Sequence, residues 1–245
     1  MSKLSNSRPS YLRARGTRHR ARAAQNATTH HATLVESRWE CRGLRRLTFQ
    51  SPTLDRDWDL GDRLMISVDA GVRRQYTVCS VHPCRGMFEI LAVAHPGGPG
   101  GRWVRSLALG AVVTLFGPKP DLDVRTAGAQ TLVLLGDETT VGLYEAVHRA
   151  RRGAVRIIGA VEHAAAVDLG SCEVPVLAGV GLFPRDDKRP GALLHQWIGA
   201  HELSTPQTVF FVNGHGAAVR SLRLALLAKG VRGVAIRSRA FWGRA

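Results

Sequence analysis

The sequence predicts a six-stranded antiparallel barrel followed by an α/β domain with a parallel sheet. Short strand-like segments separated by glycine and proline fill the first half of the chain. In the second half, continuous apolar runs alternate with helical segments, as in parallel sheets with crossover helices. The segment Phe116-Gly117-Pro118-Lys119-Pro120 breaks both patterns. We therefore expect a barrel domain over residues 33–120 and an α/β domain over residues 121–245.

The first 32 residues form a basic segment without hydrophobic periodicity. They hold seven lysines and arginines and no acid, which leaves +8 of the net charge of +15 for the rest of the chain. Such a composition predicts a disordered tail. Two roles stay open, a solvated leader or weak contact with the phosphates of nucleic acid or an anionic membrane. No secretory h-region is present, and no apolar run approaches the roughly 20 residues of a membrane span, so we expect a cytoplasmic protein.

Six segments of the first half have strand character. Residues 44–49 alternate roughly between apolar and polar side chains, and glycine or proline stands at the breaks between segments. This spacing, without long helices, is typical of a small barrel or sandwich. The expected strands are residues 32–37, 44–49, 62–68, 74–80, 87–94 and 111–116.

The second half repeats strand and helix. Residues 131–135 are almost continuously apolar, as expected for a strand buried on both faces. The turn after them leads into a helix with a basic end, and Gly230 caps the last helix. The expected strands are residues 131–135, 154–161, 174–180, 208–212 and 231–237, and the expected helices are residues 141–150, 192–200 and 217–229.

The run Arg74-Gln75-Tyr76-Thr77 places a cation, an aromatic ring and a hydroxyl within four residues. Alternation along a strand puts Arg74 and Tyr76 on one face and turns Thr77 away. Such an edge suits a flat, anionic cofactor. On these residues alone, a barrel strand with an exposed arginine and a half-buried tyrosine is the simpler interpretation.

A glycine-rich segment follows one strand downstream, from Ala94 to Val104. Its glycines permit close approach of the backbone, and the residues up to Leu107 can start a helix. Exposed N–H groups at a helix start bind phosphate, so this segment is a candidate diphosphate site, with a plain barrel loop as the alternative.

Two turns of the second half follow predicted parallel strands, where open α/β sheets bind ligands. They are Gly136-Asp137-Glu138-Thr139-Thr140 and Asn213-Gly214-His215-Gly216. The two acids can equally be helix-capping residues. At the C-terminus, Phe241 and Trp242 stand between arginines and could close over a stacked ring or pack as a terminal strand.

The remaining chemistry-bearing residues show no metal or nucleophile motif. Cys41, Cys79, Cys84 and Cys172 form no CxxC pair, and the ten histidines show no HExxH spacing, so we assign no metal. Four scattered cysteines fit a reducing compartment. The sequence also lacks a GxSxG context and a Walker loop.

These pieces, in this order, resemble the siderophore-interacting protein family of flavin-dependent ferric-siderophore reductases, within the ferredoxin-reductase-like superfamily. The resemblance covers about residues 33–245. The matching segments are Arg74-Gln75-Tyr76-Thr77-Val78, His95 to Trp103, Gly117 to Pro120, Gly136-Asp137-Glu138-Thr139, Gly214 to Arg220 and Ala240 to Arg244. The chain departs from the family pattern at Pro96, at Gly100-Gly101, at residues 182–186, at His215 and at Phe241.

The resemblance implies FAD as cofactor, with NADPH, NADH or a protein as electron donor and a ferric siderophore or another anionic iron chelate as acceptor. Arg74 would pair with a flavin phosphate, Tyr76 would stack on the flavin ring, and Thr77 would hydrogen-bond near its reactive nitrogen. The other implied residues are His95, Gly97, Gly98, Gly100, Gly101 and Trp103 for FAD, Gly136, Asp137, Glu138, Thr139 and Gly214 for the nicotinamide nucleotide, Trp242 for closing the pocket, and Lys119, Arg239 and Arg244 for the chelate.

Reduction would release the iron, because hard oxygen ligands hold Fe(II) more weakly than Fe(III). Two alternatives stay open at this point. One is a general flavin or ferredoxin-type reductase with another acceptor. The other is a non-catalytic flavin-holding module whose basic tail contacts nucleic acid.

Overall fold

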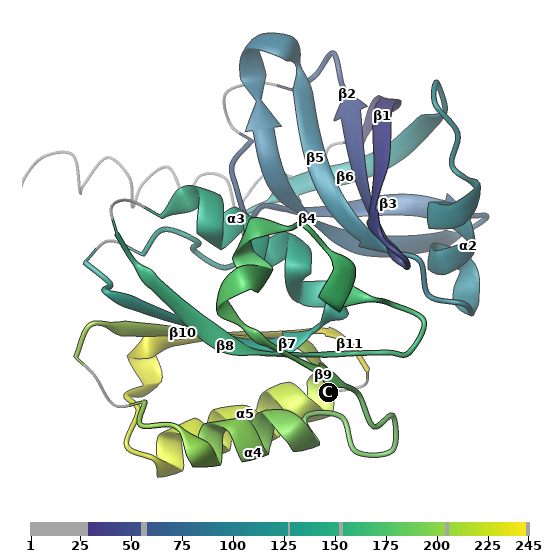
Figure 1. Cartoon of the computed structure of the whole chain (residues 1–245). Helices are drawn as coiled ribbons and strands as arrows, with labels where there is room; N and C mark the ends of the chain where they lie inside the picture. Colours follow the sequence, from purple (N-terminus) through teal and green to yellow (C-terminus); the bar gives the residue numbers. More distant parts are fainter. Residues whose placement is uncertain (1–28, 55–57, 127, 152–153, 204–205, 244–245) are drawn as a thin grey trace, which may run out of the picture.

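The fold consists of a closed barrel and an open, twisted sheet flanked by helices (Figure 1). The structure is a computed structural model that describes residues 29–54, 58–126, 128–151, 154–203 and 206–243. The expected basic tail up to residue 28, and Arg244, lie outside the described residues. Within them, no helix has both the length and the hydrophobicity to cross a membrane.

The barrel confirms the prediction of six antiparallel strands, which pair in the order β1-β2-β5-β4-β3-β6. β1 begins at Thr29, earlier than expected, because its first residues pair with β6 from Thr29 opposite Phe116. A helix, α2 (Gly98–Ser106), connects β5 to β6. The strands are β1 (Thr29–Cys41), β2 (Leu44–Gln50), β3 (Arg63–Asp69), β4 (Val72–His82), β5 (Met87–Val93) and β6 (Val112–Lys119).

The interior of the barrel is filled by the alternating apolar side chains of its strands. Phe49 and Phe88 stack with ring centroids 5.4 Å apart, and Trp58 packs on Phe88 at 4.9 Å. Trp103 and Val104 of α2 belong to the same buried cluster, so this helix closes one end of the barrel. Leu34, Leu47, Leu64, Ile66, Val78, Ile90 and Leu115 complete the fully buried set.

The second half forms a five-stranded parallel sheet in the order β11-β10-β7-β8-β9. Helix α3 covers the face toward the barrel, and α4 and α5 cover the opposite face (Figure 1). The elements are β7 (Thr131–Asp137), α3 (Val141–Ala150), β8 (Arg156–His163), β9 (Gly181–Pro184), α4 (Ala192–Ala200), β10 (Thr208–His215), α5 (Gly216–Ala228) and β11 (Ile236–Trp242).

Two strand predictions in this sheet were wrong in position. Residues 174–180 are not a strand: Pro175–Gly179 form a 3-10 turn, and the strand is β9, just after it. Pro175 has no N–H to give to a ladder, and Leu177 N–H bonds back to the carbonyl of Val174 at 2.9 Å. The last strand lies at β11 rather than 231–237, because Gly233–Ala235 also form a 3-10 turn.

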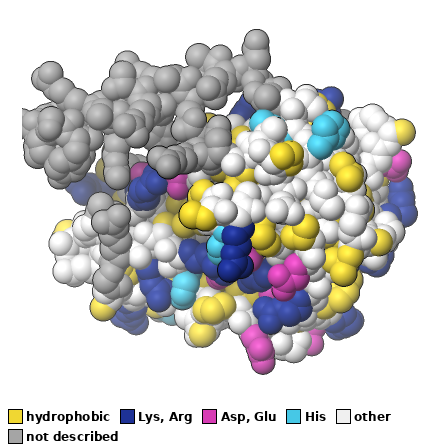
Figure 2. Space-filling model, turned by 90° about the horizontal axis from the view of Figure 1, so that it is seen from above, with side chains coloured by type: hydrophobic (Ala, Val, Ile, Leu, Met, Phe, Trp, Pro, Cys, Tyr) yellow, Lys and Arg dark blue, Asp and Glu magenta, His cyan; other side chains and the backbone are white. Residues whose placement is uncertain are grey.

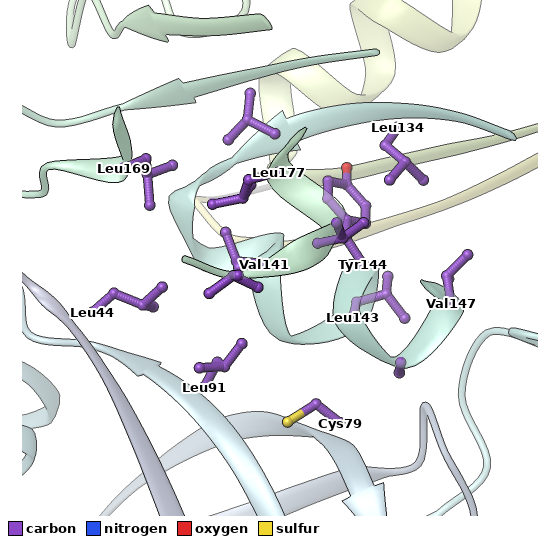
Figure 3. Packing of buried hydrophobic residues seen from close by; sticks show 14 of the residues in the cluster. Leu44, Cys79, Leu91, Leu134, Val141, Leu143, Tyr144, Val147, Leu169 and Leu177 are labelled. Atoms are coloured by element: carbon purple, nitrogen blue, oxygen red, sulfur yellow. The ribbon is translucent and has the colours of Figure 1, made fainter. Parts of the chain in front are cut away.

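An apolar interface joins the two halves through α3 (Figure 3). Leu44, Cys79 and Leu91 of the barrel pack in one buried cluster with Val141, Leu143 and Val147 of the helix. Full burial of one such leucine or valine contributes roughly 1.5–3 kcal/mol. This packing fixes the α/β domain against β4 and β5.

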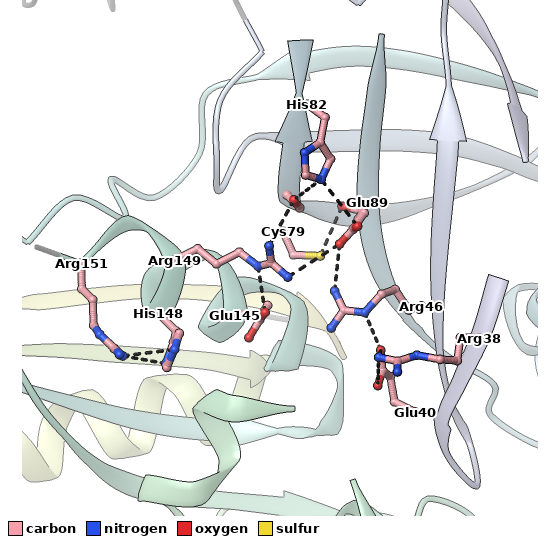
Figure 4. A network of polar contacts seen from close by, with 11 residues as sticks. Arg38, Glu40, Arg46, Cys79, His82, Glu89, Glu145, His148, Arg149 and Arg151 are labelled. Atoms are coloured by element: carbon pink, nitrogen blue, oxygen red, sulfur yellow. Dashed lines mark hydrogen bonds and ion pairs between the residues drawn. The ribbon is translucent and has the colours of Figure 1, made fainter. Parts of the chain in front are cut away.

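A polar network reinforces the same interface (Figure 4). Glu89 of β5 accepts a hydrogen bond from Arg46 of β2 at 3.0 Å and lies 3.8 Å from a guanidinium nitrogen of Arg149 on α3. Arg149 also pairs with Glu145 of its own helix at 2.8 Å. These ion pairs orient α3 on the barrel wall.

A disulfide crosses between the halves, whereas the scattered cysteines were expected to fit a reducing compartment, in which disulfides are rare. It joins Cys41 at the end of β1 to Cys172 after β8, with Cα atoms 5.0 Å apart. The two residues are 131 positions apart, so nothing in their local sequence pairs them. Cys79 is buried and free, and Cys84 is exposed and free.

Candidate functional site

A cavity of about 400 Å³ opens where β4 leaves β5, at the junction with the α/β domain. β4 pairs with β3 from Val72 to Thr77 but pairs with β5 only from Val78 onward. The residues of β4 before Val78 are not paired with β5, so this edge of β4 is open to the cavity. Thr77 therefore borders the cavity, although its side chain alternates with that of Tyr76. The cavity is lined by Arg74, Gln75, Tyr76, Thr77, Leu91, Val93, His95, Gly97, Gly98, Pro99, Gly100, Gly101, Thr139, Gly142, Arg185, Phe241 and Trp242.

Tyr76 gives the barrel side of the cavity an aromatic wall. Its ring lies 5.5 Å from the ring of Trp103, at an interplanar angle of 39°, so α2 supports it from behind. Burial raises the pKa of Tyr76, and the nearby charge of Arg74 opposes that shift. The hydroxyl therefore stays protonated at neutral pH. Arg74 itself is exposed at the rim.

The glycine segment brings the start of α2 to the cavity. A Cβ on Gly101 would lie 2.0 Å from the carbonyl oxygen of His95, so only glycine permits this approach. Gly97, which precedes α2, has no side chain to cap the helix, and no acid stands in the first turn. Pro99 has no N–H, so the N–H groups of its glycine neighbours are the ones that can bind an anion, helped by the positive end of the helix dipole.

Arg105, near the end of α2, holds the loop that precedes this helix. Its guanidinium donates to the carbonyl oxygens of Ala94 at 3.1 Å, His95 at 2.5 Å and Pro96 at 3.2 Å. Three carbonyls are thereby bound to one arginine of the helix's own last turn. This arrangement fixes the loop that precedes α2.

Asp137 organises the opposite wall, at the ends of β7, β10 and β11. Its Oδ1 accepts from the N–H and the hydroxyl of Thr139, at 3.0 and 2.5 Å. Its Oδ2 accepts from His215 N–H at 2.9 Å and from Trp242 Nε1 at 2.8 Å. Gly214 is required here, because a Cβ on it would lie 2.3 Å from Oδ2. Asp137 thus holds Trp242 in place at the cavity.

Glu138 lies beneath the same wall and is fully buried. Its Oε2 accepts from Arg185 Nη1 at 2.5 Å, and its Oε1 lies 3.8 Å from His95 Nδ1. Arg185 also lies 5.1 Å from the ring centroid of Trp242. Burial and the charge of Asp137 raise the pKa of Glu138 to about 7, although Arg185 opposes this shift.

Comparison with known families decides the identity of the barrel half. Residues 43–122 match the model of the siderophore-interacting FAD-binding domain. The chain carries a siderophore-interacting FAD-binding domain. The resemblance stated from the sequence is confirmed over this part, and the match supports FAD as the cofactor. No curated protein matches the chain at the sequence level.

Solved structures share the fold of the FAD-binding domain together with the α/β half. The siderophore-interacting protein from Acinetobacter baumannii has a TM-score of 0.75 at 20% identity, covering 90% of this chain and 92% of its own. A siderophore utilization protein from T. fusca has a TM-score of 0.74 at 20% identity, covering 90% and 95%. The ferredoxin reductase in carbazole 1,9a-dioxygenase reaches 0.71 at 20% identity, covering 89% and 71%. At these identities the likeness establishes a ferredoxin-reductase-like fold alone.

The cavity of the FAD-binding domain fits the group for which the domain is named. Its ring-sized aromatic wall at Tyr76 stands beside uncapped helix N–H groups and the guanidinium of Arg74. Eight of the nine residues expected to hold FAD line the cavity, and the ninth, Trp103, packs behind Tyr76. Trp242, expected to close the pocket, also lines it.

The residues expected to hold a nicotinamide nucleotide are only partly accessible. Of this group, Thr139 alone borders the cavity beside the FAD-binding domain. Gly136, Asp137, Glu138 and Gly214 are buried. Asp137 already accepts four hydrogen bonds, so its carboxylate serves to organise the wall.

Of the residues expected to contact the iron chelate, Lys119 and Arg239 do not line the cavity, and Arg244 lies outside the described residues. Lys119 is exposed at the end of β6. Arg239 of β11 is half-buried and forms an ion pair with Asp121. Because this carboxylate occupies its guanidinium, Arg239 is less available to an anionic ligand than the sequence suggested.

The sequence did not reveal the parts played by Arg105 and Arg185. Arg105 stands in the last turn of a short helix, where a solvent-facing arginine is ordinary. Arg185 follows directly after β9, at the edge where parallel strands end. That position was a usable signal, but the misplaced third strand hid it.

Proposed function

We propose that the chain is an FAD-dependent oxidoreductase that passes electrons to ferric iron held in a siderophore or another anionic iron chelate. The observation that carries the proposal is the composition of the cavity. Barrel residues suited to a flavin and its phosphates face Thr139, Arg185 and Trp242 of the α/β domain across it. A cofactor in this place would be reached from both domains.

The chain's own residues would bind and position the cofactor. The guanidinium of Arg74 and the free N–H groups of α2 would hold the phosphates, and the ring of Tyr76 would lie along the flavin. Trp242, fixed by Asp137, would cover the opposite side. When bound, the flavin supplies the ability to accept an electron pair and to release electrons singly.

The electron donor would be NADPH, NADH or a protein, and the acceptor an anionic ferric chelate. Two electrons reduce two Fe(III) ions to Fe(II), which hard oxygen ligands hold less tightly. The charge of +8 outside the first 32 residues would attract such a chelate. Lysine and arginine side chains are spread across the face shown in Figure 2, and acidic side chains lie beside some of them.

A reconstitution and turnover experiment tests the proposal. Purified protein loaded with FAD should show flavin absorbance, lose it with NADPH or NADH in the absence of oxygen, and regain it on addition of a ferric siderophore. A ferrous-specific chelator should then report the Fe(II) that is formed. Failure to bind FAD would overturn the proposal.

The acceptor separates the proposal from a general flavin or ferredoxin-type reductase. Reduced holoprotein would be mixed with a ferric siderophore, a ferredoxin and a small quinone in parallel. Reoxidation by the ferredoxin or the quinone, without reoxidation by any ferric chelate, would favour the general reductase.

A further inference from the structure

Glu138 keeps a carboxylate oxygen without a donor directly beneath the cavity wall. Its side chain has no exposed surface, and Arg185 binds only Oε2. Among the described residues, Oε1 has no hydrogen-bond partner. A buried acceptor left without a donor costs roughly 1–3 kcal/mol. Such an oxygen is a position at which a proton can be held.

His95 connects this oxygen to the cavity. Its Nδ1 lies 3.8 Å from Oε1, its side chain is 36% exposed, and it borders the cavity. This distance is just beyond that of a hydrogen bond, so a small movement of either side chain brings the two atoms into contact. His95 at the cavity and Glu138 behind it therefore form a path of two titratable groups from the cavity into the protein interior.

The charges around the pair come from two elements besides their own. Asp137 at the end of β7 and the burial of the site favour a proton on Glu138, and Arg185 after β9 disfavours it. Burial and Arg185 lower the pKa of His95, while Asp137 and Asp187 oppose that shift. Asp187 binds the other side of Arg185 at 2.8 Å. A neutral imidazole at pH 7 can accept a proton and pass it on.

We propose that His95 and Glu138 form a proton relay that ties protonation of the site to its redox state. This inference rests on the proposed function. When two electrons enter the cavity, the added negative charge favours a proton: His95 takes it from solvent, and Glu138 Oε1 receives it from Nδ1. In the first transfer an N–H bond forms at His95 as solvent loses a proton. In the second, the Nδ1–H bond of the imidazolium breaks and an O–H bond forms at Glu138, which turns the carboxylate into a carboxylic acid. When two ferric ions each remove one electron, the proton returns by the same path.

Proton uptake at equilibrium tests the relay in FAD-loaded protein. The dependence of the midpoint potential on pH gives the protons bound per two electrons, for wild type and for Glu138→Gln. Around neutral pH the wild type should bind more protons per two electrons than Glu138→Gln. Below about pH 5 the two proteins should bind equal numbers, because the Glu138 carboxyl is then protonated in both redox states. Equal uptake at every pH would overturn the relay.

Glu145→Gln is the matched control. Glu145 is likewise buried, pairs with an arginine through one oxygen and leaves Oε2 without a hydrogen-bond partner in the described structure. It lies in the domain interface and does not line the cavity. Its substitution should leave proton uptake as in the wild type. A loss equal to that of Glu138→Gln would assign the effect to any buried carboxylate and overturn the relay.

An infrared titration of flavin-free protein separates this inference from the proposed function. The carbonyl stretch of a protonated carboxylic acid should disappear across neutral pH in the wild type and in Glu145→Gln, and should be missing in Glu138→Gln. Absence of the band from the wild type at pH 6 would overturn the relay even if the protein reduces ferric chelates. If the wild type shows the band but cannot be loaded with FAD, the proposed function is overturned, and so is the coupling of the relay to the redox state.

His95→Gln tests the entry step and does not depend on the stability of Glu138→Gln. At equal FAD occupancy, stopped-flow mixing with a pH-indicator dye should show proton uptake slowed by at least about tenfold, with the final uptake unchanged. An unchanged rate would exclude His95 from the relay.

Discussion

Asp137 accepts a hydrogen bond from the indole nitrogen of Trp242 at 2.8 Å, so a carboxylate at the end of β7 fixes the last aromatic side chain of β11. The same carboxylate accepts from Thr139 and from the backbone of His215. Four donors converge on two oxygens, and together they join three strand ends into one wall of the cavity.

Asp137→Asn should therefore destabilise the protein. The amide keeps one acceptor and turns a pair of its own donors toward existing donors, which should cost roughly 2–3 kcal/mol. Urea unfolding measures the loss, and Trp242 fluorescence should become more solvent-like. Asp186→Asn is the control: this surface carboxylate pairs with Arg189 in solvent, and its substitution should leave the free energy of unfolding nearly unchanged. Equal effects of the two substitutions would contradict the role of Asp137 in holding this wall of the cavity together.

Arg74→Ala and Tyr76→Ala should each weaken FAD binding. Loss of one charge-assisted hydrogen bond to a phosphate costs roughly 1.5–3 kcal/mol, which is about a tenfold to hundredfold loss of affinity. Removal of the stacking ring should have an effect of similar size. Titration of flavin-free protein with FAD, followed by flavin fluorescence, gives the dissociation constants.

Arg73→Ala is the matched control for this pair. Arg73 is also exposed on β4, but its guanidinium lies 3.7 Å from the ring centroid of Phe116 and does not line the cavity. Its substitution should leave FAD affinity unchanged. If all three variants bind FAD equally well, the cofactor does not lie along β4.

Gly101→Ala should disrupt the start of α2. The new Cβ would lie 2.0 Å from the His95 carbonyl oxygen, and that oxygen is also held by Arg105. Backbone atoms cannot yield as a flexible side chain does, so the loss of stability should reach about 3 kcal/mol. Gly97→Ala is the comparison, because its φ is −101° and no heavy atom lies within 4 Å of the added Cβ. Thermal unfolding of both variants should separate them clearly.

The disulfide between Cys41 and Cys172 should stabilise the fold strongly. It closes a loop of 131 residues between the barrel and the α/β domain, and the chain-entropy estimate for such a loop is about 4–5 kcal/mol. Cys41→Ser should lower the free energy of unfolding. It should also abolish the difference in gel mobility between the reduced and the non-reduced protein. Cys84→Ser changes an exposed free thiol and should do neither.

The barrel strands and the barrel residues that line the cavity could be predicted because both depend on local pattern. Glycine and proline marked the ends of the barrel strands, and Tyr76 and Gly101 lie in short motifs whose chemistry shows in the sequence. The strand expected at 174–180 failed because apolar composition alone does not distinguish a strand from a turn that begins at Pro175. The contacts of Glu138 could not be predicted, since Arg185 and His95 are each more than 40 residues from it and only the fold brings them together.

The raised pKa of Glu138 should also make stability depend on pH. The folded protein keeps the proton on this carboxyl up to about pH 7, whereas the unfolded chain releases it near pH 4.5. Between these values unfolding releases a proton, so the free energy of unfolding should fall as the pH rises from 4.5 to 7, by up to about 3 kcal/mol from this group. Urea unfolding of wild type and Glu138→Gln across this range isolates the contribution. The difference between the two proteins should vary with pH in this window and level off above it; a constant difference would mean that Glu138 is ionised throughout.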